Sequence, residues 1–393
     1  MVRRKREAFQ FRVSELLTLK MMPATVTKRI APPKRLIYGP GPSMVDPRVY
    51  EAIAQPIVGI RDPYFLEIMG EIKAGLREVF GTANQKIFLV PGSGSAAMEA
   101  AVANFVPPGA KFAIFTAGHF ANRMAIAAER HGAVVVRLEK PWGEVFTAEE
   151  AERFIEREQP HAVCFVQAET STGAYQSGRA IVPAAKKAGA LVIADCVTSL
   201  GAMPVELDAV GIDVAYSCSQ KGLSCPAGLS PLSSSPKAWK WLEQRTDEPR
   251  TWYLDLRLMD KYFDPPHVYH HTPCPPLYYA MHEALSVIEE EGLRNRWDRH
   301  LRAGQRLTAG LTRLGFEPFV KEPQDRIWHL TTVLPPPGVS EAGLREKLLD
   351  KYDIEIAGGL GQVAGKILRI GTMGPLASEE HVDSLLEAVA ACM

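Results

Sequence analysis

Short apolar runs alternate with helix-like segments along the chain from about residue 34 to residue 291. The runs that predict strands are 86–90, 111–115, 133–136, 162–166, 191–194 and 212–216. Most of them are continuously apolar, which is typical of strands buried on both faces of a parallel sheet. The repeated strand–helix–strand order therefore predicts an α/β fold, with a mostly parallel sheet flanked by helices.

Helix ends can also be located in this region. Thr147 and Glu150 have the spacing of a capping box, and the helix that they begin must end before Pro160. Residues 179–189 predict a further helix, because the glycine at its end is typical of a helix C-terminus.

The pattern changes after about residue 292. It predicts a helix, a strand, a second helix and a second strand at 293–314, 327–333, 340–352 and 367–370. A final amphipathic helix follows, on which the apolar residues share one face: Val382, Leu385, Leu386 and Val389. This mixture of short elements is typical of a small α+β domain.

The chain is therefore predicted to have three parts. A large domain covers residues 34–291, and a smaller C-terminal domain covers residues 292–393. Residues 1–33 begin with a basic cluster and lack the apolar core of a signal peptide. We expect them to form an N-terminal arm that is mobile or lies over a neighbour.

Composition excludes several classes of protein. Lys+Arg and Asp+Glu both number 45, so the chain lacks the basic surplus of a nucleic-acid scaffold. No run of 18 apolar residues predicts a membrane span. The 6 cysteines have no zinc-ligand spacing, so no metal site is expected. A reducing, cytoplasmic location fits them best, with a mitochondrial or peroxisomal one left open.

Three segments that follow predicted strands could carry chemistry, because open α/β sheets bind ligands at the carboxyl ends of their strands. The first is Pro-Gly-Ser-Gly-Ser at 91–95, which leads into a helix. Small residues there allow backbone amides and hydroxyls to surround a phosphate. An ordinary helix cap would have the same composition, and the segment lacks the spacing of a dinucleotide fingerprint or a P-loop.

The other two segments each place one ionisable residue after a strand. Asp195 ends an apolar run, where a carboxylate is costly unless it is paired. It is either a turn residue or the partner of a cationic ring nitrogen. Lys221 lies among small residues after the next run, where burial and nearby cations would make its amine a nucleophile. A phosphate turn, an acid and such a lysine together predict a pyridoxal 5′-phosphate site.

Further short motifs occur in a fixed order: 38–43, 91–95, 169–173, 194–197, 211–221, 269–272, 356–361 and 368–371. In these motifs the chain resembles the class-V aminotransferases of fold type I, and within them the alanine–glyoxylate and serine–pyruvate aminotransferases. The resemblance extends from Arg35 to the end of the chain. It implies a large cofactor-binding domain with a mostly parallel sheet, followed by a smaller C-terminal domain.

The resemblance also implies roles at the matching positions. Lys221 would hold the cofactor covalently and move the proton at the substrate's α-carbon, and Asp195 would bind the ring nitrogen. The phosphate and its surroundings would be lined by Ser93, Gly94, Ser95 and Gln220. The residues around the ring would be Thr170, Val197 on one face and Phe120 on the other.

Substrate and subunit contacts follow from the same resemblance. Arg369, whose planar fork suits a carboxylate, and Gly39 would bind the substrate. Tyr269 and Thr272 would reach the phosphate held by a neighbouring subunit, which implies a homodimer.

The implied reaction moves an amino group from alanine or serine to glyoxylate. Aspartate, ureidoglycine or aminoethylphosphonate as donor, and pyruvate as acceptor, remain alternatives. More distant ones are a cysteine-desulfurase-like lyase, which would need Cys225 or Cys274, and a non-catalytic binding protein. The chain departs from its relatives at Ser95 and Ile60, where some have His, and at Phe120, where close relatives often have Trp.

Overall fold

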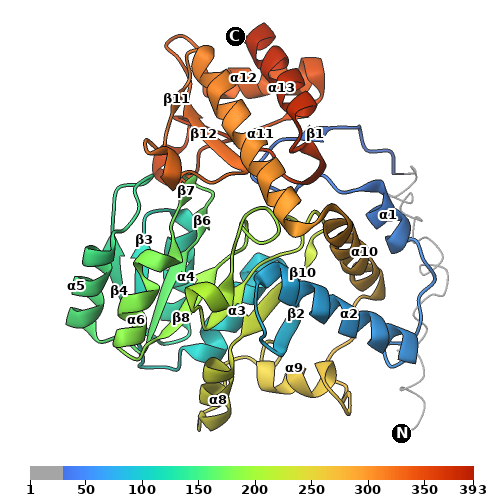
Figure 1. Cartoon of the computed structure of the whole chain (residues 1–393), viewed down its shortest axis with the longest axis vertical. Helices are drawn as coiled ribbons and strands as arrows, with labels where there is room; N and C mark the ends of the chain where they lie inside the picture. Colours follow the sequence, from blue (N-terminus) through green and yellow to red (C-terminus); the bar gives the residue numbers. More distant parts are fainter. Residues whose placement is uncertain (1–29) are drawn as a thin grey trace, which may run out of the picture. The chain divides into compact units, whose positions relative to one another are not determined.

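The computed structural model describes residues 30–393 (Figure 1). Residues 36–393 form one compact unit. The preceding unit, Met1–Arg35, is described only from residue 30 onward, where it has no helix or strand. The N-terminal arm expected over residues 1–33 therefore lies almost wholly outside the described residues. The domain boundary after residue 291 stays a prediction.

A seven-stranded sheet with the order β2-β10-β9-β8-β5-β3-β4 forms the centre of the larger unit. In chain order its strands are β2 (Lys86–Gly92), β3 (Lys111–Thr116), β4 (Val134–Glu139), β5 (Ala162–Val166), β8 (Leu191–Asp195), β9 (Val214–Tyr216) and β10 (Gly228–Ser234). β3, β4, β5, β8 and β9 pair in parallel. The mostly parallel α/β sheet predicted from the apolar runs is confirmed.

Strand β10 is an addition to the predicted sheet. It pairs antiparallel with β2 on one side and with β9 on the other. Two antiparallel pairings leave β2 and β9 pointing in the same direction. The carboxyl ends of β2, β8 and β9 therefore meet at one edge of the sheet, where parallel sheets bind their ligands.

Helices pack against both faces of this sheet (Figure 1). The helices in this part of the chain are α1 (Pro47–Ile53), α2 (Pro63–Phe80), α3 (Gly94–Phe105), α4 (His119–Arg130), α5 (Ala148–Glu158), α6 (Val182–Lys187), α7 (Leu207–Val210), α8 (Pro236–Gln244), α9 (Leu256–Phe263) and α10 (Pro275–Glu291), of which α1 packs against α10. The predicted capping box is present at α5, where Thr147 and Glu150 each bind the other's backbone amide.

The C-terminal part contains a second, antiparallel sheet with the order β11-β12-β15-β14. Its elements are α11 (Leu293–Arg313), β11 (Glu317–Pro318), β12 (Leu330–Leu334), α12 (Glu341–Tyr352), β14 (Ala357–Gly358), β15 (Leu368–Gly371) and α13 (Glu379–Cys392). The strand predicted from residue 327 begins at Leu330 instead. Ile327 is not part of this strand, and its N–H donates instead to Gly173 O at 2.9 Å.

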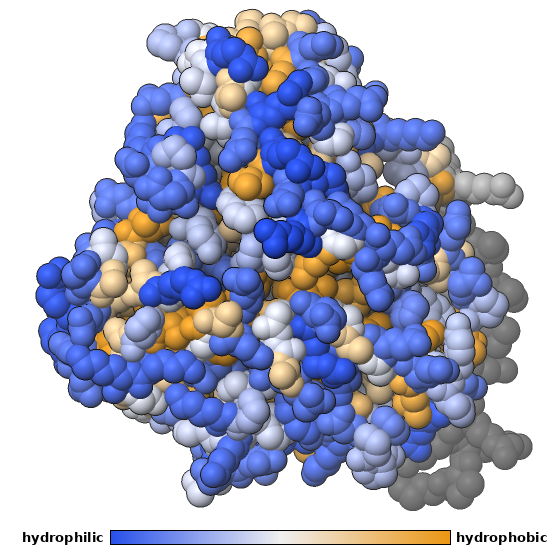
Figure 2. All heavy atoms as spheres, in the orientation of Figure 1, coloured by the Kyte–Doolittle hydropathy of each residue, from blue (hydrophilic) through white to orange (hydrophobic). Residues whose placement is uncertain are grey.

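Two short pairs of strands complete the topology. β1 (Leu36–Ile37) runs parallel to β13 (Ile354–Glu355), and β6 (Ala168–Glu169) pairs with β7 (Ala174–Tyr175). Hydrophilic side chains predominate on the face seen in Figure 2, with hydrophobic ones in smaller patches. Within residues 30–393, no helix is both long and apolar enough to cross a membrane. The cytoplasmic location stays a prediction.

Candidate active site

Asp195 ends strand β8 and is almost fully buried (6% exposed). Its Oδ1 accepts a hydrogen bond from Val197 N at 2.9 Å, and its Oδ2 accepts one from Tyr216 Oη at 2.7 Å. Tyr216 ends the neighbouring strand β9, so the parallel pairing of β8 and β9 brings the two side chains together. Burial raises the pKa of the Asp195 carboxyl to about 6. A cation facing this carboxylate would lower the pKa again.

Lys221 lies in the turn after β9, and its amine donates to Pro40 O. Burial lowers the pKa of this amine, and the charge on Arg369 lowers it further. Gly41 has a φ of +112°, and a Cβ there would lie 2.5 Å from the Lys221 Nζ. Glycine at position 41 therefore leaves the space that the lysine side chain occupies.

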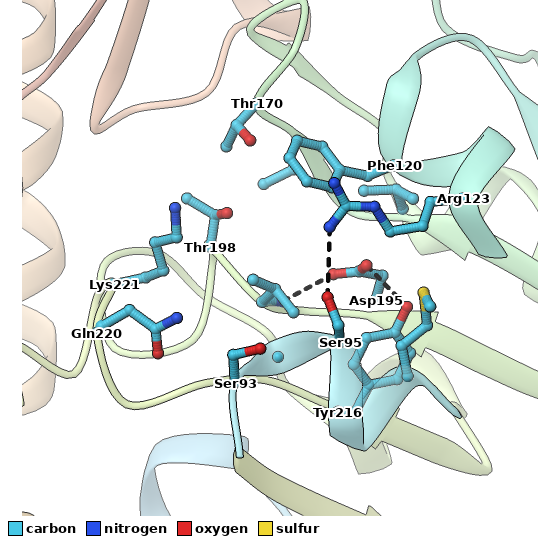
Figure 3. Close-up of a pocket in the computed structure, with 15 residues that line it drawn as sticks. Ser93, Ser95, Phe120, Arg123, Thr170, Asp195, Thr198, Tyr216, Gln220 and Lys221 are labelled. Atoms are coloured by element: carbon cyan, nitrogen blue, oxygen red, sulfur yellow. Dashed lines mark hydrogen bonds between the residues drawn. The ribbon is translucent and has the colours of Figure 1, made fainter. Parts of the chain in front are cut away.

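A cavity of about 200 Å³ separates these two residues. Figure 3 shows Lys221 and Asp195 on its opposite sides. The predicted cofactor-binding residues that line it are Ser93, Gly94, Ser95, Phe120, Thr170, Asp195, Val197, Gln220 and Lys221. Residues from five separate loops and helix starts are thus brought to one place.

The N-terminus of α3 forms one wall of the cavity. Ser93 is the N-cap residue, yet its hydroxyl makes no capping hydrogen bond and stays available to a ligand. At Gly94 a Cβ would lie 2.9 Å from Val197 Cγ2, so only glycine allows the helix to begin this close to Val197. The Gln220 Oε1 is buried and has no hydrogen-bond partner within residues 30–393. Amide donors and an unused hydroxyl at a helix N-terminus suit a phosphate.

Arg369 and Gly39, the predicted substrate-binding residues, do not line this cavity but adjoin it. Arg369, on β15, donates from Nε to Gly358 O at 2.6 Å and from Nη1 to Thr170 O at 3.2 Å. Because Thr170 lines the cavity, this hydrogen bond brings the Arg369 guanidinium next to a residue of the cavity wall. Gly39 precedes Pro40, the residue whose carbonyl accepts from Lys221.

Tyr269 and Thr272 lie apart from the cavity of their own chain. Their hydroxyl groups are 3.0 Å apart and hydrogen-bonded, and Tyr269 is 51% exposed. Ile60 also lies away from the cavity, where its carbonyl accepts from Tyr262 Oη at 2.9 Å. These positions leave the predicted contacts with a neighbouring subunit untested.

Residues 58–385 match the family described as Aminotransferase class-V. The chain belongs to the class-V aminotransferases. Alanine–glyoxylate aminotransferase of Rattus norvegicus is 37% identical over 93% of this chain and 89% of that protein. This chain is also similar to the crystal structure of alanine–glyoxylate aminotransferase from Nostoc sp., with 44% sequence identity and a TM-score of 0.91. The match covers 93% of this chain and 97% of that one. The crystal structure of ureidoglycine–glyoxylate aminotransferase from Bacillus subtilis has 35% sequence identity and a TM-score of 0.90. That match covers 93% of this chain and 94% of the other.

Membership of this family makes the protein a pyridoxal-5′-phosphate-dependent aminotransferase, whose substrates are amino acids and 2-oxo acids. The residues that line the cavity of this aminotransferase also fit this cofactor chemically. Asp195 needs a cation to offset its burial, and the helix N-terminus at Ser93 offers donors to a phosphate. Lys221 supplies an amine of lowered pKa on the opposite side.

The aminotransferase cavity also contains residues that the sequence analysis missed. Arg123 donates from Nη1 to Ser95 Oγ at 3.3 Å, and its guanidinium carbon lies 5.0 Å from the centre of the Phe120 ring. Tyr216 binds Asp195, as described above. Arg123 lies three residues after Phe120, one helical turn along α4, so the helical period could have indicated it. Tyr216 could have been indicated by its position at the end of a strand next to that of Asp195.

Proposed function

We propose that this aminotransferase transfers the amino group of alanine or serine to glyoxylate, so that pyruvate or hydroxypyruvate and glycine are formed. The observation that carries the proposal is the shared cavity, with Lys221 and Asp195 at opposite sides and Arg369 bound to the carbonyl of Thr170, which lines it. Relatives that are named for the alanine–glyoxylate reaction and are 35–44% identical support this pair of substrates.

In the proposed mechanism Asp195 and Lys221 act on opposite parts of the cofactor. Pyridoxal 5′-phosphate supplies a ring that withdraws electrons from the substrate's α-carbon. The Asp195 carboxylate accepts a hydrogen bond from the ring nitrogen and keeps it protonated. The Lys221 amine holds the cofactor covalently between turnovers and removes the proton from the α-carbon of the amino acid. A poised acid–base group of this kind contributes about 10²–10⁴-fold to the rate.

Ring and phosphate are held by separate groups. Val197 and Phe120 would cover the two faces of the ring, with Thr170 beside it. The phosphate is assigned to Ser93, Gly94, Ser95 and Gln220. Gln220 would donate to the phosphate from Nε2, because its Oε1 is an acceptor, as the phosphate oxygens are.

Arg369 and Gly39 are assigned to the substrate. Alanine, serine and glyoxylate share an α-carboxylate, which a guanidinium can bind through two parallel hydrogen bonds. Two of the Arg369 donors are used by Gly358 and Thr170, which fix the plane of the guanidinium.

A panel of amino donors tests the proposal. Holoenzyme is mixed with one donor at a time and no acceptor, and the visible absorbance of the cofactor is followed. We expect alanine and serine to convert it at least about tenfold faster than aspartate or aminoethylphosphonate, which need more room. Glyoxylate should then restore the absorbance faster than pyruvate. Faster conversion by aspartate or aminoethylphosphonate would overturn the proposed donor.

Ureidoglycine with glyoxylate is the second candidate, because the Bacillus subtilis relative that is 35% identical is named for it. It is decided in the same panel by including ureidoglycine. A cysteine-desulfurase activity is disfavoured, since Cys225 is buried, burial raises its pKa, and Cys274 lies outside the cavity. Release of sulfide from cysteine without an oxo acid would support it instead.

The proposed functional unit is a homodimer in which Tyr269 and Thr272 of one chain bind the phosphate held by the other. Both hydroxyl groups lie outside the cavity of their own chain, and Tyr269 is half exposed. A partner chain could therefore approach both of them.

A further inference from the structure

Glu169 is a buried carboxylate that forms no ion pair in the described part of the chain, although its charge interacts with that of Arg369 at longer range. It is 5% exposed, and no lysine, arginine or histidine of the described chain forms an ion pair with it. Four hydrogen bonds satisfy its two oxygens. Oε1 accepts from Ser171 Oγ at 2.5 Å and from Ser171 N at 3.1 Å, and Oε2 accepts from Phe120 N at 3.0 Å and from Ala121 N at 3.2 Å. Such bonds are needed, because a buried charge is otherwise very costly.

These contacts cap helix α4 from outside the helix. Its own N-cap residue, Gly118, has no side chain to bind the free amides. Ser171 Oγ accepts from His119 N at 2.9 Å, so the first three amides of α4 are all bound by Glu169 and Ser171. A Cβ at Gly118 would lie 2.2 Å from Glu169 Cδ, so the glycine makes room for the carboxylate. A negative charge at this end of a helix is also favoured by the helix dipole.

The same carboxylate lies between residues that form the site. Phe120, whose amide it binds, lines the cavity. Thr170, the next residue after Glu169, also lines the cavity, and its carbonyl accepts from Arg369. A shift of Glu169 would therefore displace both Phe120 and the Thr170 carbonyl that binds Arg369.

We propose that Glu169 is a positioning residue that fixes the Phe120 ring at stacking distance from the cofactor. Glu169 does not itself line the cavity, so it acts through the α4 backbone and not by touching the ring. The inference rests on the proposed function, in which the cofactor ring lies between Phe120 and Val197.

A merely structural helix cap is the competing explanation, and the chain offers a matched control for it. Thr147 caps α5 through its hydroxyl and the Glu150 amide, 3.3 Å apart. Neither Thr147 nor any residue of α5 lines the cavity. Thr147→Ala therefore removes a cap without touching the proposed stacking contact.

The test measures binding of pyridoxamine 5′-phosphate, which needs no covalent bond to Lys221. Dissociation constants are measured by titration calorimetry for the unaltered chain and for Glu169→Gln, Ser171→Ala, Phe120→Ala and Thr147→Ala. Melting temperatures of the cofactor-free proteins are recorded in parallel. Circular dichroism in the cofactor band reports the orientation of the bound ring.

We expect Phe120→Ala to weaken binding about tenfold and Glu169→Gln about fivefold, as for the loss of an aromatic contact. Ser171→Ala should weaken binding about threefold, because it removes two of the hydrogen bonds in the cap. The dichroism of the bound cofactor should change in all three. Thr147→Ala should lower the melting temperature yet bind as tightly as the unaltered chain.

Two results would overturn the inference, and they differ in what else they reject. If Glu169→Gln and Ser171→Ala bind within about twofold of the unaltered chain while Phe120→Ala binds weakly, Glu169 is only a cap and the ring placement stands. If Phe120→Ala also binds normally, the ring does not lie on Phe120, and that part of the proposed function fails as well. If Glu169→Gln does not fold, Ser171→Ala decides alone.

Discussion

Asp195 is the residue at which function and stability conflict most directly. In the chain without cofactor, burial raises the pKa of its carboxyl from 3.8 to about 6. The folded state therefore binds this proton more tightly than the unfolded state. Its contribution to stability is complete below pH 3.8 and is lost as the pH rises through 6. The ionised carboxylate then destabilises the cofactor-free fold by about 3 kcal/mol.

Asp195→Asn should consequently stabilise the cofactor-free protein. We expect its free energy of unfolding at pH 7.5 to rise by about 2 kcal/mol, since the amide can still accept from Val197 N and keep Tyr216 as a neighbour. The gain should vanish near pH 4. Urea denaturation at both pH values measures it, and a variant that is less stable at pH 7.5 would contradict the argument. With cofactor bound, the aspartate should be the more stable form, because the ring nitrogen then pairs with it.

Arg369 combines a proposed substrate contact with two backbone contacts. Arg369→Lys keeps the positive charge but loses the planar fork, so the KM for alanine should rise about tenfold while kcat changes less. Steady-state kinetics with alanine and glyoxylate measures this. Pyridoxamine phosphate affinity serves as the control and should stay unchanged. An unaltered KM would reject the assignment of the carboxylate to Arg369.

Helix α11 joins the Lys221 turn to the C-terminal part. Arg296, 3% exposed, donates to Gly201 O at 3.0 Å and to Gly222 O at 2.9 Å. Gly222 directly follows Lys221. Arg296→Met leaves both carbonyls without this donor, and we expect the free energy of unfolding to fall by about 3 kcal/mol. Arg302→Met, on the exposed side of the same helix, should change it by no more than about 0.5 kcal/mol in the same denaturation experiment. Equal effects would show that Arg296 is dispensable.

Strands and helices with a clear apolar pattern could be predicted from the sequence. Strand β10 shows why an element without such a pattern could not. Its sequence is Gly-Leu-Ser-Pro-Leu-Ser-Ser, and proline and buried serine are both unusual inside a sheet. The serines are tolerated because they find partners: Ser230 Oγ donates to Gly92 O at 3.0 Å, and Ser233 Oγ accepts from Asn84 Nδ2 at 3.1 Å. Those partners lie more than a hundred residues away in the chain, so no local pattern reveals them.

The same distinction applies to the site. Asp195 ends β8 and Lys221 lies in the turn after β9, and the geometry of a parallel sheet brings such residues to one edge. Glu169 begins the motif at 169–173, but its contact with the α4 amides depends on how two loops pack. Its task could be inferred only from the hydrogen bonds to Phe120 and Ala121. Local sequence predicts which residues face the ligand better than it predicts which residues hold them.

On the scale of the whole molecule, two exposed aromatic side chains, Trp252 and Tyr253, pack against His270, the residue next to Tyr269. The rings of Trp252 and His270 are stacked with centres 4.6 Å apart, and Trp252 is 65% exposed. Tyr253 adjoins the same histidine and is 44% exposed. Exposed apolar surface of this kind is typical of a protein interface. It adjoins Tyr269, so a partner that covers these rings would also meet that hydroxyl.

A heterodimer experiment decides whether Tyr269 and Thr272 act across subunits. Lys221→Ala and the double variant Tyr269→Phe, Thr272→Val are coexpressed with different tags, and the mixed dimer is isolated. Each homodimer should be nearly inactive at limiting cofactor. In the mixed dimer, one cavity combines an intact lysine with intact hydroxyl groups from its partner, so about half of the normal activity should return. If the hydroxyl groups served their own chain, both cavities would keep a defect and no activity would be recovered.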